Sequence, residues 1–182
     1  MLRIEVPSCE FYDESKEEFL TIKGQTLVME HSLISISKWE AKWKKSYFSE
    51  EKKTTAEILD YLRCMTISPQ NVHPSLYLAL SSSQLEEISN YINDPMTATT
   101  INQIPGRRGR NELLTSELVY YYMIAQNIPV EFEKWHINRL LTLIRVCSIK
   151  NDPKQKKMSP SEIRRQNRAI NAARRKRLGT KG

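Results

Sequence analysis

Residues 131–147, EFEKWHINRLLTLIRVC, constrain the fold most, because apolar side chains recur there at helical spacing. No glycine or proline follows until Pro153, so the segment is long enough for four to five helical turns. A helix with so broad an apolar face has to be covered by other helices. The segment is therefore predicted to be the central helix of a small helical core. Its apolar residues are Phe132, Trp135, Ile137, Leu140, Leu141, Ile144 and Cys147.

Further segments with helical signals could supply the covering helices. Ser35 or Ser37 is predicted to cap a helix that carries Trp39 and Trp43, and Glu40 stands in the capping-box position for Ser37. Thr54 or Thr55 is predicted to begin the next helix. The other predicted helices cover residues 74–80, 82–94 and 112–127.

The N-terminus has the pattern of strands. Residues 2–6, LRIEV, alternate apolar and polar side chains, which is the period of a strand with one covered face. The segments EFLTIK and QTLVME flank Gly24 and favour two short strands or one bent hairpin. The predicted fold is mainly α, with five to six helices, a small N-terminal antiparallel sheet and a basic C-terminal helix. Three segments are expected: 1–32 rich in strands, 33–150 helical, and 151–182 basic.

Positive charge is concentrated at the C-terminus. Residues 154–182 hold eleven Lys or Arg and one acid, a net charge of +10, whereas residues 1–153 hold seventeen bases and twenty acids, a net charge of −3. Ser159 as cap and Pro160 at the first position predict a helix start. Such a helix attracts polyanions or acidic proteins without reading sequence, because it has no aromatic residues; a solubilising arm is an equal alternative. The predicted polyanion-binding residues are Arg164, Arg165, Arg168, Arg174, Arg175 and Arg177.

Signals for catalysis, cofactors and metals are weak in this sequence. The three histidines are far apart, and no metalloprotease, phosphate-loop or nucleophile-elbow motif occurs. His136, beside Trp135, is interpreted as a histidine at the edge of the core in preference to a ligand or base. Three widely spaced cysteines favour neither disulfides nor zinc. We therefore expect no catalytic residue, no metal and no cofactor.

Aromatic residues are the strongest signal for protein contacts. Trp39 and Trp43 lie one helical turn apart, which favours core packing over a partner platform. Tyr120, Tyr121 and Tyr122 cannot all face inward, so some of them are expected at the rim of an interface. Trp39, Trp43, Tyr120 and Tyr121 are the candidate partner-binding residues.

Several phrases of the sequence resemble a family encoded in the tail-morphogenesis region of long-tailed bacteriophages. They are HSLISISKWEAKW, LRCMTI, NDPMTATT, WHINRLLTLIRVC and the C-terminal KKMSPSEIRRQNRAINAARRKRLGTKG. Members of that family look like tail assembly chaperones. The resemblance implies a non-enzymatic protein in the cytoplasm of the infected host, which binds the tape measure protein and keeps it soluble while the tail tube assembles. Self-association is a further expected interaction.

Two other functions stay open from the sequence. One is a nucleic-acid-binding phage protein that uses the arginine-rich arm, together with Arg107, Arg108 and Arg110. The other is a structural virion component, such as a connector or tail completion protein. No membrane partner is expected, because the sequence has no apolar run of the length that a span requires.

Overall fold

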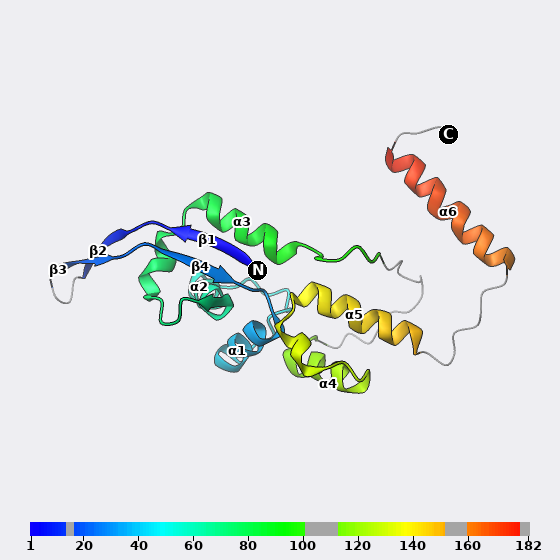
Figure 1. Ribbon diagram of the computed structural model, residues 1–182, viewed down its shortest axis with the longest axis horizontal. Helices are drawn as coiled ribbons and strands as arrows, with labels where there is room; N and C mark the ends of the chain where they lie inside the picture. The colour runs from blue at the N-terminus through cyan, green and yellow to red at the C-terminus, as the bar shows by residue number, and fades with distance from the viewer. Residues whose placement is uncertain (14–16, 101–112, 152–159, 179–182) are drawn as a thin grey trace. The chain divides into compact units, whose positions relative to one another are not determined.

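A computed structural model describes residues 1–13, 17–100, 113–151 and 160–178 (Figure 1). Contacts divide the chain into two units, Met1–Ser148 and Ile149–Gly182, and each is described by itself. The described residues form six α-helices, two 3₁₀-helices and five strands. The predicted fold class, mainly α with a small N-terminal antiparallel sheet, is confirmed.

The first four strands form one long, bent hairpin. These strands are β1 (Leu2–Val6), β2 (Cys9–Asp13), β3 (Glu18–Ile22) and β4 (Gln25–Met29). β1 pairs with β4 and β2 pairs with β3, both antiparallel, and Figure 1 shows the β2–β3 end extending away from the helices. The hairpin bends between the two pairs, where Gly24 lies against the opposite strand. A Cβ atom there would lie 2.7 Å from the Ser8 backbone nitrogen and 2.8 Å from the Val6 carbonyl oxygen, so the close approach requires glycine.

A fifth strand, β5 (Thr66–Ser68), pairs with β4 and completes a three-stranded sheet in the order β1-β4-β5. The sequence predicted strands at β1, β3 and β4, but not at β2 or β5. β5 has only three residues, which is too short for a recognisable alternation. One face of the sheet enters the core through Ile4, Val6, Leu27 and Met29, each at most 3% exposed.

The first two helices begin at side-chain caps. α1 (Leu33–Trp43) is capped by Ser32, whose Oγ accepts from the Ser35 N–H at 3.3 Å. The prediction of Ser35 or Ser37 as the cap is wrong, because the helix begins earlier and the Ser35 hydroxyl donates instead to the Glu30 carbonyl. α2 (Thr55–Met65) has the predicted cap at Thr54, with Glu57 completing a capping box.

Two further helical segments follow α2 and β5. The 3₁₀-helix η1 (Pro74–Ala79) is followed by α3 (Ser82–Asn93). A second capping box, formed by Ser81 and Gln84, lies at the start of α3. α3 packs beside β1, and the Gln84 side-chain amide donates to the Glu5 carbonyl at 2.7 Å. α4 (Ser116–Ala125) is shorter than the predicted helix over residues 112–127, because Thr115 caps it. Residues 101–112, which include the three arginines at 107, 108 and 110, lie outside the described residues.

The predicted central helix over residues 131–147 is not continuous. The structure has a 3₁₀-helix, η2 (Val130–Lys134), followed by α5 (Ile137–Lys150). Trp135 is extended and His136 forms a β-bridge with Ser32, while the Ile137 N–H donates to the His31 carbonyl at 2.7 Å. The backbone of residues 136 and 137 thus forms hydrogen bonds with residues more than 100 positions earlier. The spacing of apolar residues within the segment could not predict this interruption of the helix.

Sheet and helices share one hydrophobic core. It joins the inner face of the sheet to Leu33, Ile36 and Trp39 of α1 and to Ile137, Leu140 and Ile144 of α5. Residues 1–32 and the helices up to Ser148 therefore form one unit, without a boundary at residue 32. The second unit contains the basic helix α6 (Pro160–Leu178). Within the described part of the chain, no helix is both long and apolar enough to cross a membrane.

Candidate partner-binding surfaces

The two tryptophans of α1 are structural residues. Trp39 is 1% exposed, and its indole N–H donates to the Glu57 carbonyl of α2 at 2.8 Å. Trp43 is half-buried, and its N–H donates to the Asp60 carboxylate at 2.9 Å. The partner platform considered for this pair is therefore not present in this conformation, because the helical spacing that puts both rings on one face directs that face onto α2.

The two predicted tyrosines of α4 differ in exposure. Tyr120 is half-buried and its hydroxyl donates to Glu133 at 2.9 Å. Burial and the Glu133 carboxylate raise the pKa of Tyr120 to about 12, so the hydroxyl stays a donor. Tyr121 is 60% exposed, and its ring contacts that of Tyr122. Of the four predicted contact residues, Tyr121 alone presents most of its side chain to solvent.

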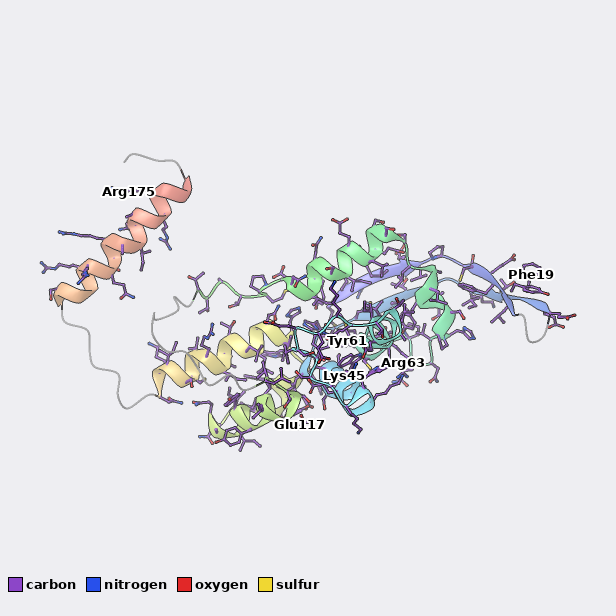
Figure 2. All side chains as sticks on the ribbon, turned by 180° about the vertical axis from the view of Figure 1, so that it is seen from behind. Phe19, Lys45, Tyr61, Arg63, Glu117 and Arg175 are labelled. Carbon is purple, nitrogen blue, oxygen red and sulfur yellow. The ribbon has the colours of Figure 1, made fainter. Side chains whose placement is uncertain are left out.

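Helix α4 is apolar almost all round, although only one side of it is buried. Ser116, Val119 and Met123 form the buried side, at intervals of three and four residues. Tyr121 and Ile124 lie on another side and are 60% and 76% exposed. Glu117, which is labelled in Figure 2, is also exposed and precedes Tyr121 by four residues, so it lies on the same side of the helix. We call Glu117, Tyr121 and Ile124 the α4 outer face.

Polar contacts hold α4 against the end of α1. Glu40 of α1 accepts hydrogen bonds from the Ser116 N–H and the Tyr47 N–H, both at 2.7 Å. The Ser46 hydroxyl donates to the Leu114 carbonyl. The α4 outer face is therefore presented by a helix whose N-terminus is fixed to the core.

A second exposed aromatic group lies on the β2–β3 ribbon. Phe19, labelled near the end of the hairpin in Figure 2, is 73% exposed, and Tyr12 on the facing strand is 53% exposed. Their ring centroids are 5.2 Å apart, so they support each other across the strands. Tyr12, Phe19 and Ile124 were not among the contact residues predicted from the sequence. The signal for Ile124 was present, because the sequence ELVYYYMIA has no polar side with which a helix could face water.

The predicted arginines lie along α6. Arg164, Arg165, Arg168, Arg174 and Arg175 are exposed, and the first three line a shallow hollow with Ser161. Arg177 is part of the helix, but its side chain is outside the described set, as is the predicted cap Ser159. The sequence thus placed these residues correctly on one helix.

Two buried histidines, one after β4 and one before α5, contact each other and helices α2 and α3. The His31 and His136 rings are 5.0 Å apart, and the Tyr61 hydroxyl is hydrogen-bonded to His31 Nδ1. His136 Nδ1 accepts from the Asn138 N–H, so its Nε2 donates to the Tyr91 carbonyl at 3.0 Å. Burial, together with His136, lowers the pKa of His31 to about 3, and burial also lowers the pKa of His136. Both rings are therefore neutral at physiological pH.

Mild acid should destabilise the protein through His31. The unfolded chain protonates this histidine below its ordinary pKa of 6.5, whereas the folded protein does so only near 3. Stability is thus retained above about pH 6.5 and lost as the pH falls, by about 2 kcal/mol at about pH 5. Chemical denaturation between about pH 7.5 and 5 measures the change. His31→Gln should flatten the dependence, and an unchanged slope in that variant would assign it to other groups.

Neither a metal site nor a known relative identifies a functional site. Among the residues that the structure describes, no group of three or more His, Cys, Asp or Glu lies together in a way that could hold a metal ion. Comparisons with protein-family models, with curated proteins and with solved structures gave no match.

Proposed function

We propose that this protein is a non-enzymatic tail assembly chaperone of a long-tailed bacteriophage, which binds the tape measure protein in the cytoplasm of the infected host. The phrases that resemble that family suggest the role, and the α4 outer face is the observation that carries it. A helix that is apolar almost all round is normally enclosed by protein. Here Tyr121 and Ile124 lie in solvent, so a partner has an apolar and aromatic surface to cover.

The chemistry of this surface suits a chaperone. Tyr121 offers an aromatic body with a polar tip, a combination enriched at protein interfaces. Glu117, one turn away, adds a charge at the margin that keeps the surface hydrated before binding. A surface of two large side chains gives modest affinity per copy, which allows a client to be held and later released to tube subunits.

The proposal is tested by co-expression with the tape measure protein. Soluble client should appear with the wild-type chain and decrease with Tyr121→Glu/Ile124→Glu, for which we expect an affinity about 10- to 100-fold weaker. The matched control is Ile58→Glu/Leu85→Glu, which adds the same charge at two other exposed apolar residues, 46% and 42% exposed, on α2 and α3. Equal client solubility with both double variants would refute the assignment of the α4 outer face.

A further inference from the structure

Helix α6 has the charge pattern of a nucleic-acid-binding element, independently of the proposed function. Its 19 residues include six Arg, one Lys and a single acid, Glu162. The described arginine side chains are exposed, and none of them forms an ion pair with a carboxylate among the described residues. These guanidinium groups are therefore available to an external anion.

The average density of cations along α6 is similar to the density of phosphates along a DNA strand. Seven cations lie between residues 164 and 177, a rise of about 20 Å, or one positive charge per about 3 Å. A strand of duplex DNA carries one phosphate per about 3.4 Å of helix axis. Arg164, Arg168 and Arg175 follow one another at i, i+4 and i+11, which places all three on one face of the helix. This line of arginines is suited to follow a phosphate backbone.

Other anionic partners fit α6 less well. Protein interfaces have an apolar or aromatic centre, and α6 contains no Phe, Trp, Tyr or Met. Helices that lie on membranes carry a continuous face of large apolar residues opposite their cations. Among its 19 residues α6 has only three large apolar ones, Ile163, Ile170 and Leu178, which are too few for such a face. Six of its seven cations are arginine, whose planar fork binds phosphate oxygens through two hydrogen bonds.

We infer that α6 binds the sugar-phosphate backbone of nucleic acid without reading its sequence. Arginine contacts to phosphates release condensed counterions, so the affinity depends steeply on salt. The absence of aromatic residues from α6 leaves no platform on which bases could stack, so sequence preference is weak. With four to six phosphates contacted, binding should weaken by roughly 100- to 1,000-fold between about 50 and 200 mM salt.

The test uses the full chain, purified with nuclease and high salt, and fluorescently labelled duplex DNA. Arg164→Gln/Arg168→Gln/Arg175→Gln should weaken binding at least about 100-fold at low salt and reduce the salt slope by about 2 to 3. The corresponding triple Lys variant keeps the charge but loses the planar fork, so it should keep the salt slope of wild type and lose less affinity than the triple Gln variant. The matched control, Lys23→Gln/Lys52→Gln/Lys150→Gln, removes the same charge from exposed residues outside α6 and should bind within about threefold of wild type.

Three outcomes would overturn the inference. They are no binding by wild type at low salt, equal weakening by the control and α6 variants, and displacement of the DNA by polyglutamate at equal charge concentration. The last result would assign α6 to acidic proteins. Because the α6 variants leave the α4 outer face intact, client solubility in the co-expression assay separates failure of this inference from failure of the proposed function.

Discussion

Trp39→Ala is expected to lower the free energy of unfolding by about 3–5 kcal/mol, which is enough to unfold much of a marginally stable protein. The side chain is 1% exposed and packs its ring against the edge of Tyr47, with centroids 5.6 Å apart. Its removal leaves a large cavity between α1 and α2 and takes away the hydrogen bond to the Glu57 carbonyl. Chemical denaturation followed by far-UV circular dichroism measures the loss.

The control for this prediction is the neighbouring tryptophan. Trp43 is half-buried, so Trp43→Ala should cost only about 1–2 kcal/mol. Trp39→Phe keeps most of the ring volume and should cost less than Trp39→Ala. Equal losses for the two alanine variants would mean that the rings are buried alike, contrary to the structure.

Glu40→Ala is expected to cost about 3 kcal/mol or more, because one carboxylate satisfies two backbone N–H groups. Glu40 is 7% exposed, and it links the N-terminus of α4, through Ser116, to the turn after α1, through Tyr47. Without it, both N–H groups lose their acceptor, and the Ser116 group is buried. Thermal and chemical unfolding both report the change.

Two comparisons make the Glu40 result specific. Glu40→Gln keeps one side-chain acceptor and should lose less stability than the alanine variant. Glu87→Ala removes an exposed carboxylate from α3 and should change stability by no more than about 0.5 kcal/mol. A stable Glu40→Ala protein whose client binding is unchanged would show that this carboxylate does not hold α4 in place.

Elements defined by neighbouring residues were predictable, and elements defined by distant residues were not. The Thr54–Glu57 capping box and the alternation of residues 2–6 are local signals, and the structure has both. The break before α5 depends instead on the pairing of His136 with Ser32, and β5 depends on the open edge of β4. Neither pairing can be predicted from the spacing of apolar residues within its own segment.

The same distinction applies to the candidate surfaces. The basic residues of α6 could be assigned to a single helix because their charge is visible in the sequence. The burial of Trp39 and the exposure of Tyr121 depend on which neighbours cover each helix, and tryptophan and tyrosine suit both environments. Lack of amphipathicity over residues 116–125 was the available clue that an apolar side would stay uncovered.

The pairing of residues 31–32 with residues 136–137 has a consequence for biosynthesis. The ribosome adds about 5–20 residues per second, so the hairpin, α1 and α2 exist for several seconds before Ile137 is made. During that interval the core lacks Ile137, Leu140 and Ile144, which the later helix provides. A chain terminated before Ile137 would keep that apolar surface open, so we expect nascent or truncated forms to aggregate unless another protein covers them.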